Sequence, residues 1–143
     1  MERSATGALT AVPGCLAEGL QAMGNSFFTL YFVRGRTGSA LVDTGISAMA
    51  DGVIGQLDAL GVRPDTLIVT HPHPDHINGL AALRERFPEA RVVIGPGAAE
   101  FLAHPKTAAS LVAEDRFMSD FLASRGLKPG RPPIERPPSV DGA

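Results

Sequence analysis

The sequence lacks the features that would assign the protein to several large classes. Its 143 residues include one cysteine and no tryptophan, and Cys15 alone cannot form an internal disulfide. No apolar run approaches the roughly 20 residues that a membrane-spanning helix needs. The first residues also lack the unbroken apolar stretch of a signal peptide. We therefore expect a cytoplasmic protein with neither a membrane segment nor a disulfide framework.

An excess of charge of one sign is also missing. The 13 Lys and Arg residues are scattered among 15 Asp and Glu residues, and the formal net charge is −2. Because no basic stripe stands out, the sequence gives no electrostatic reason to expect a nucleic-acid partner. With 44% hydrophobic residues, the chain has instead the composition of a folded domain with its own core.

Apolar and aromatic patterning predicts the strands of an α/β domain. Residues 26–33 and 39–43 are typical of two strands joined by a tight turn, so they should pair as a hairpin. Continuous apolar runs at residues 66–70 and 91–95 are typical of strands covered on both faces. The aromatic strand at 26–33 is likewise expected to be covered on both faces.

Helices are predicted between these strands and after the last one. They span residues 47–60, 77–87, 98–103 and 107–125. Apolar residues recur at helical spacing on the inner faces of three of them: Met49, Val53, Leu57 and Leu60; Ile77, Leu80, Leu83 and Phe87; and Leu111, Phe117, Phe121 and Leu122. The alternation of strands and helices predicts a layered α/β fold with a largely parallel sheet after the opening hairpin.

The C-terminal segment has a different composition. Five of the 12 prolines lie within one stretch of ten residues in this segment, and they disfavour both a helix and a central strand there. We expect the domain to occupy residues 1–127, and residues 128–143 to form a linker or a loose tail.

Histidines are concentrated directly after the apolar run at residues 66–70. In α/β sheets, ligands collect beyond the carboxyl ends of the strands, so the position favours a site. Pro72 and Pro74 bias the residues before them toward an extended backbone. The side chains of His71 and His73 should then point the same way and can face one metal ion.

Asp75 and His76 extend this cluster. If the chain enters a helix after Pro74, both lie in its first turn and can face a second ion. Imidazole nitrogen with a carboxylate suits zinc, with iron and manganese as alternatives. The prolines exclude the helical zinc-hydrolase pattern in which two His four residues apart flank a Glu. The alternative interpretation, a solvated polar turn, fits three His and one Asp at a strand end less well.

This cluster resembles the signature of the metallo-β-lactamase superfamily of metallohydrolases. The signature is two His one residue apart, one further residue, and then Asp-His, as in residues 71–76, and Gly79 stands where the family usually has a glycine. An apolar strand that ends in Asp-Thr-Gly at 43–45 and the Val-Pro-Gly entry at 12–14 are further similarities. The resemblance covers about residues 10–125.

The resemblance implies an αββα sandwich, of which this chain would carry the N-terminal half, with two divalent metal ions at one edge. His71 and His73 would hold the first ion, and Asp75 and His76 the second, most naturally as zinc. Asp75 would also steer the attacking water or accept its proton as a catalytic residue. Asp43 would orient the ligands from outside. From local sequence alone, an Asp before Thr-Gly is a common turn former.

The activity that the resemblance implies is attack by a metal-bound hydroxide on an ester, thioester, lactone, amide or phosphoester of a small molecule. The remaining ligands of the family lie downstream, and no histidine follows His104, which we interpret as an ordinary surface residue near a helix end. We therefore expect a truncated domain, inactive or weakly active alone, that self-associates through an uncovered sheet face. Two alternatives are a non-catalytic metal-binding or interaction module and an iron-dependent persulfide oxygenase on the same fold.

Overall fold

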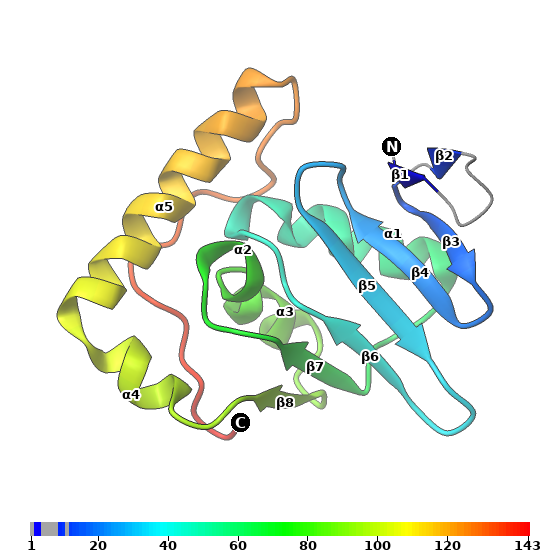
Figure 1. The fold of residues 1–143 in the computed structure, drawn as a ribbon, viewed down its shortest axis with the longest axis horizontal. Coiled ribbons are helices and arrows are strands. Elements are labelled where there is room, and N and C mark those ends of the chain that lie inside the picture. The colour runs from blue at the N-terminus through cyan, green and yellow to red at the C-terminus, as the bar shows by residue number, and fades with distance from the viewer. Residues whose placement is uncertain (1, 4–8, 11) are drawn as a thin grey trace.

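The computed structural model describes residues 2–3, 9–10 and 12–143 (Figure 1). The expectation that no signal peptide is present concerns the start of the chain, where residues 1, 4–8 and 11 lie outside the described part. Within the described ranges, no helix is both long and apolar enough to span a bilayer.

A six-stranded sheet with the strand order β3-β4-β5-β6-β7-β8 forms the centre of the fold, and β1 pairs separately with β2. Strands β3 to β6 are antiparallel, whereas β6, β7 and β8 are parallel. The elements in chain order are β1 (Glu2–Arg3), β2 (Leu9–Thr10), β3 (Gly14–Ala17), β4 (Leu20–Gly24), β5 (Thr29–Arg34), β6 (Ser39–Val42), the 3-10 turn η1 (Ser47–Met49), α1 (Ala50–Leu60), β7 (Thr66–Val69), α2 (Pro74–Ile77), α3 (Leu80–Arg86), β8 (Arg91–Ile94), α4 (Ala98–Ala103) and α5 (Pro105–Ser124).

The predicted α/β class, the hairpin of β5 with β6 and the parallel strands β7 and β8 are confirmed. The hairpin of β3 with β4 was not predicted. Residues 14–24 read Gly-Cys-Leu-Ala-Glu-Gly-Leu-Gln-Ala-Met-Gly, without a β-branched or aromatic side chain. Local sequence therefore gives no strand signal there, and pairing with the neighbouring β5 provides the strand context.

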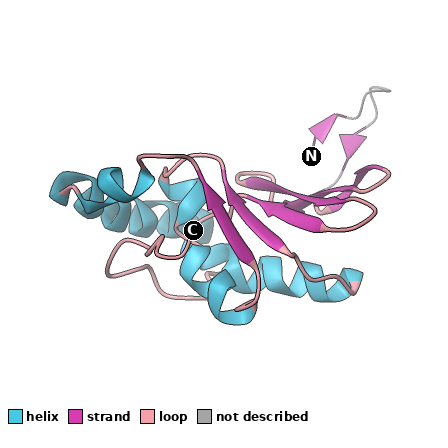
Figure 2. Ribbon diagram, turned by 90° about the horizontal axis from the view of Figure 1, so that it is seen from below, coloured by secondary structure: helices cyan, strands magenta, loops and turns pink. Residues whose placement is uncertain are grey.

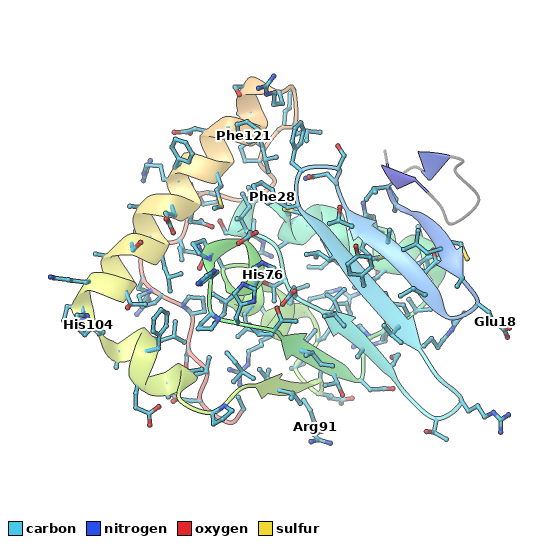
Figure 3. The ribbon with its side chains drawn as sticks, viewed as in Figure 1. Glu18, Phe28, His76, Arg91, His104 and Phe121 are labelled. Atoms are coloured by element: carbon cyan, nitrogen blue, oxygen red, sulfur yellow. The ribbon has the colours of Figure 1, made fainter. Side chains whose placement is uncertain are left out.

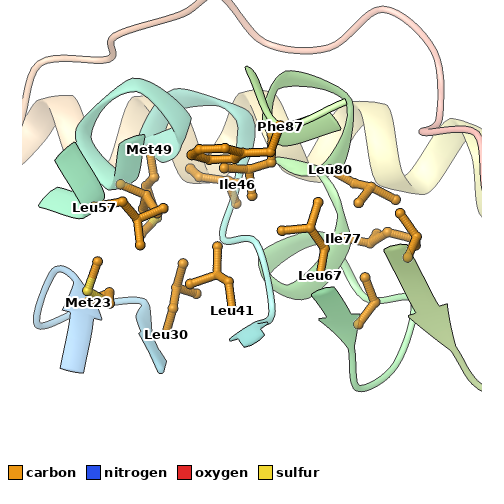
Figure 4. Packing of buried hydrophobic residues seen from close by; sticks show 14 of the residues in the cluster. Met23, Leu30, Leu41, Ile46, Met49, Leu57, Leu67, Ile77, Leu80 and Phe87 are labelled. Carbon is orange, nitrogen blue, oxygen red and sulfur yellow. The ribbon is translucent and has the colours of Figure 1, made fainter. Parts of the chain in front are cut away.

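The helices lie on one side of the sheet (Figure 2). The core forms where the sheet's inner side chains meet α1, α2 and α3, and Figure 4 shows this interface from close by. From the strands it contains Met23, Leu30, Leu41 and Leu67, and from the helical side Ile46, Met49, Leu57, Ile77, Leu80 and Phe87. This single apolar layer fixes the sheet against the helices, and burying it stabilises the fold by about 25 cal/mol per Å² of apolar surface.

The opposite face of the sheet is open. Tyr31, Val33 and Val93 are 37%, 41% and 39% exposed, and the register aligns Tyr31 with Val42 and Ile68 with Val93 across four neighbouring strands. The expectation that the strands at 26–33, 66–70 and 91–95 are covered on both faces is therefore wrong for the described residues. Their continuous apolar sequence marks a face for which the described chain supplies no covering layer.

Two predicted helix faces also need correction. Leu60 is exposed in the last turn of α1, just before Gly61 ends that helix in a left-handed conformation. Phe117 is 72% exposed on α5, because six residues at about 3.6 per turn place it about 240° from Leu111. The residues of α5 that are buried are spaced by four, four and three: Leu111, Asp115, Ser119 and Leu122.

Residues 128–143 contain no helix or strand, in agreement with their proline content, and they lie along the helical layer. The backbone N–H of Ile134 donates to the buried carboxylate of Asp115 (2.9 Å), which also accepts from the backbone N–H of Ser47 (3.1 Å) and from its hydroxyl. The Arg84 guanidinium donates to the carbonyl of Ser139 (3.1 Å). These bonds join the segment to α3, α5 and η1.

Candidate metal-binding site

The histidine cluster lies at the carboxyl ends of the parallel strands. Residues 70–73 follow β7, and α2 begins at Pro74, so the predicted helical entry of Asp75 and His76 is confirmed. The neighbouring strand β6 continues into Asp43, whose N–H donates to the carbonyl of Ile68 at 2.6 Å. The Asp-Thr-Gly turn and the histidine segment therefore meet at one edge of the sheet, where ligand sites of α/β folds are found.

Asp43 links the ends of both strands through its side chain. Its carboxylate accepts hydrogen bonds from the backbone N–H and the hydroxyl of Thr70, both at 2.8 Å, and Nδ1 of His76 lies 2.8 Å from its Oδ2. The backbone of Asp43 has φ of 68°, in the left-handed region that costs a non-glycine residue about 1–2 kcal/mol. The three bonds offset that cost and hold the carboxylate between the two segments.

Two backbone hydrogen bonds between residues 44–45 and residues 76–79 fix the position of α2. The N–H of Thr44 donates to the carbonyl of His76 (3.2 Å), and the N–H of Gly79 donates to the carbonyl of Gly45 (2.9 Å). A Cβ at Gly79 would lie only 2.6 Å from the Thr44 carbonyl oxygen, so this close approach requires glycine. The helix predicted over 77–87 is accordingly two helices, interrupted at Asn78 and Gly79.

These hydrogen bonds determine which nitrogen of two imidazoles is free. A carboxylate only accepts, so His76 donates Nδ1–H to Asp43 and keeps the lone pair on Nε2. The Thr70 hydroxyl gives its one hydrogen to Asp43 and therefore accepts from Nδ1 of His71, 3.0 Å away. In the neutral imidazoles, Asp43 thus favours the proton on Nδ1 of His76 directly and on Nδ1 of His71 through Thr70, so that Nε2 is the nitrogen available to a ligand.

The side chains of the cluster lie close together. The ring centroid of His71 lies 4.5 Å from that of His73 and 4.0 Å from that of His76. Nε2 of His76 lies 3.4 Å from Oδ2 of Asp75, and two ligand atoms on a tetrahedral zinc with bonds of about 2.1 Å are about 3.4 Å apart. The donor types and this spacing fit a divalent metal ion.

The candidate metal ligands form pairs and do not complete the coordination of one ion. Among the residues that the structure describes, no three or more His, Cys, Asp or Glu side chains form a group that could hold one ion. Figure 3 places His76 between the sheet and α5 and places His104 at the far end of α5. Nδ1 of His104 accepts from the N–H of Lys106 (3.2 Å) and caps α5, in agreement with its interpretation as a residue near a helix end.

Two hollows flank the histidine segment. We call the first the α5-side cavity; it measures about 500 Å³ and lies between residues 72–75 and the helices α4 and α5, with Lys106 and Glu114 in its wall. We call the second the strand-end groove; it measures about 350 Å³ and lies between residues 70–73 and the chain from Ile94 to Phe101. Pro72, His73 and Phe101 line both.

Sequence reasoning missed the part that Thr70 and the helices α4 and α5 play at this site. Thr70 precedes His71 directly, and a hydroxyl at the end of a strand that leads into a histidine cluster is the signal that was available. The walls formed by Phe101 and by α5 lie more than 20 residues from the cluster, and no spacing rule connects such distant segments.

Residues 29–142 match the family model of the metallo-beta-lactamase superfamily. The match covers most of the chain, and the chain therefore belongs to this superfamily, which confirms the resemblance seen in residues 43–45 and 71–76. Curated proteins that the chain matches within this superfamily are named as hydroxyacylglutathione hydrolases and as a probable metallo-hydrolase.

Curated relatives match over shorter segments. The chain is 40% identical over 55 residues to the hydroxyacylglutathione hydrolase of Stenotrophomonas maltophilia, which is 38% of this chain and 20% of that protein. It is 35% identical over 75 residues to the hydroxyacylglutathione hydrolase of Aeromonas hydrophila, covering 52% of this chain and 28% of the relative. The matched part thus spans less than a third of either relative's length.

Solved structures of metallo-β-lactamases share the fold. One from Cronobacter sakazakii superimposes with a TM-score of 0.58 at 26% identity over 66% of this chain and 38% of its own. A class B3 di-zinc metallo-β-lactamase from an Alaskan soil metagenome gives a TM-score of 0.53 at 25% identity over 59% of this chain and 33% of its own. Each structure contains much more chain than the part that this protein matches.

Proposed function

We propose that this chain carries the first two pairs of metal ligands of a hydrolase that cleaves an ester, thioester or related bond of a small molecule. His71 and His73 form one pair, Asp75 and His76 the other, and Asp43 positions the imidazoles. The observation that carries the proposal is the bond of Asp43 to His76, together with its link through Thr70 to His71. A carboxylate behind a histidine is the usual support of a metal-binding imidazole.

Divalent cations held by these pairs would lower the pKa of a water molecule and polarise the scissile carbonyl. The protein's own groups do the rest. The Asp75 carboxylate is one-third exposed and lines the α5-side cavity, so it can orient the attacking water and accept its proton. The Asp43 carboxylate keeps two imidazoles in one orientation, so that no rearrangement is needed when substrate binds.

Metal uptake tests the proposal directly. The 143-residue chain is loaded with zinc, desalted, and its bound metal is measured by mass spectrometry for the wild type and for His71→Ala, His76→Ala and His104→Ala. His104 is the matched control, because it is a histidine that caps α5 away from the cluster. We expect metal loss in the first two variants and none in the third.

Equal metal content in all four proteins would refute the ligand assignment. The same measurement after growth in medium with both zinc and iron separates a zinc hydrolase from the iron-dependent alternative. Hydrolysis is then assayed with thioester, ester and lactone panels. Because the chain carries only part of the family's ligand set, we expect a low rate at most, which the control His104→Ala should leave unchanged.

A further inference from the structure

Asn78 lies at the end of α2 and connects that helix to α5. It is 1% exposed, and its Nδ2 donates a hydrogen bond to the carbonyl of Leu111 in α5 at 3.1 Å. In the described part of the chain, no other hydrogen bond joins α2 or its C-terminal residue to α5. On its other side, α2 is held by the backbone bonds to residues 44–45. Asn78 therefore supplies the polar link between α2 and the helix that forms a wall of the α5-side cavity.

Residues bonded to Asn78 line the α5-side cavity. The N–H of Asn78 donates to the carbonyl of Pro74 (3.1 Å), and both Pro74 and Leu111 are part of the cavity wall. Asp75 lines the cavity too. It stands three residues before Asn78, whose backbone is helical, so the two side chains lie on neighbouring positions of one helix face. The buried amide of Asn78 thus sets where the wall at Leu111 lies relative to Asp75.

The oxygen of the same amide group is unsatisfied. A carbonyl only accepts, so the atom bonded to Leu111 is Nδ2, and Oδ1 lies on the other side of the amide. Oδ1 is buried and has no hydrogen-bond partner among the described residues. A buried acceptor without a donor lowers stability, and an apolar side chain of similar shape would avoid that loss. The Leu111 carbonyl lies inside α5 and keeps its intrahelical bond in either case. Packing alone therefore does not explain an asparagine at this position.

We infer that Asn78 is a positioning residue for the second pair of metal ligands, Asp75 and His76. This inference rests on the proposed function. The helix α2 has only four residues, and a helix of one turn has little stability of its own, so its orientation depends on what it is bonded to. The bonds to residues 44–45 hold it on the sheet side, and the bond of Asn78 to Leu111 holds it on the α5 side. Asp75 and His76 are thereby preorganised, at the cost in stability of one unpartnered buried oxygen.

Asn78→Leu separates positioning from packing. Leucine is similar to asparagine in shape, and it removes both the unpartnered oxygen and the bond to Leu111. We expect the urea midpoint of the metal-free 143-residue chain to stay the same or to rise. The dissociation constant for zinc, measured by competition with a chromophoric chelator, should nevertheless rise about 2- to 30-fold. Asn78→Ala removes the same two groups without adding volume, and it should weaken zinc binding even if leucine does not fit.

Ser119→Ala is the matched control. It removes a buried polar group from the inner face of α5, about two turns beyond Leu111, where no hydrogen bond to α2 is present among the described residues. We expect this variant to bind zinc with the wild-type affinity.

Zinc affinity that both Asn78 variants leave unchanged would overturn the inference, whatever happens to stability. So would an equal loss of zinc affinity in Ser119→Ala, because it would show that any loosening of α5 has the same effect. A wild-type chain that binds no zinc would refute the proposed function and this inference with it. A wild-type chain that binds zinc, with Asn78 variants that bind it equally well, would refute this inference alone.

Discussion

Oδ2 of Asp43, which follows β6, lies 2.8 Å from Nδ1 of His76, which lies in α2 after the neighbouring parallel strand β7. The same carboxylate holds the Thr70 hydroxyl, which in turn accepts from His71. One side chain in a left-handed backbone conformation therefore sets the protonated nitrogen of two imidazoles. The aspartate of the Asp-Thr-Gly turn is thereby connected to the histidine cluster by specific bonds and not by proximity alone.

Replacement of Asp43 by Asn should weaken zinc binding by about 10- to 100-fold. Asn tolerates the left-handed backbone, so the turn is retained, while the charged acceptor for His76 and Thr70 is lost. A competition titration with a chromophoric chelator measures the change, and thermal unfolding of the metal-free protein checks that the fold persists. Unchanged zinc affinity in a folded variant would show that Asp43 only shapes the turn.

Gly79→Ala should destabilise the protein by about 1–3 kcal/mol, because its Cβ would meet the Thr44 carbonyl oxygen at 2.6 Å. Gly52→Ala is the matched control. Its Cβ meets no described heavy atom within 4 Å in α1, so it should stabilise the helix by about 0.5–1 kcal/mol. Urea unfolding of both variants measures the difference, and equal stabilities would contradict the close contact between the turn and α2.

The order of strands and helices was predictable because its signals are local. The apolar runs at 66–70 and 91–95 and the helical spacing of the apolar residues in α3 each lie within one short segment of the chain. The hairpin of β3 with β4 and the open sheet face were not predictable in this way, since pairing and covering depend on distant chain. A residue pattern records that a face is apolar, but it does not record what covers it.

The inner face of α5 illustrates the same limit. Counting apolar residues favoured Phe117, whereas the fold buries Asp115, whose charge is satisfied by Ser47 and by Ile134 from the proline-rich segment. A buried carboxylate becomes acceptable only when partners from two remote segments reach it. In the candidate site, likewise, the residue types of 71–76 could be interpreted from the sequence. The hydrogen bonds that link Asp43 to His71 through Thr70 could not, because they depend on how the ends of β6 and β7 pack together.

Asp115→Ala should destabilise the fold by about 1–3 kcal/mol, since it leaves the N–H groups of Ser47 and Ile134 without their acceptor. Phe117→Ser, on the exposed side of the same helix, should change stability by less than about 0.5 kcal/mol. Chemical denaturation distinguishes the two. A larger loss of stability in Phe117→Ser than in Asp115→Ala would show that α5 buries the face that carries Phe117, as the sequence pattern predicted.

The open sheet face should cause self-association of the 143-residue chain, because exposed apolar rows of this kind favour burial against a second surface. Sedimentation velocity over a range of concentrations measures it. The double variant Val33→Lys and Val93→Lys should shift the protein toward monomer, whereas Leu60→Lys, an exposed apolar position on α1, should not. A wild-type chain that stays monomeric and melts cooperatively would contradict this prediction.

The protonation of the three imidazoles tests the central claim most directly. A long-range ¹H–¹⁵N spectrum of the metal-free chain, recorded where the histidines are neutral, reports which ring nitrogen carries the proton. We expect Nδ1–H on His71 and His76 and, as an internal contrast, Nε2–H on His104, whose Nδ1 accepts from Lys106. In Asp43→Asn, the spectra of His71 and His76 should change while that of His104 does not. Nε2–H on His76 in the wild type would contradict the role assigned to Asp43.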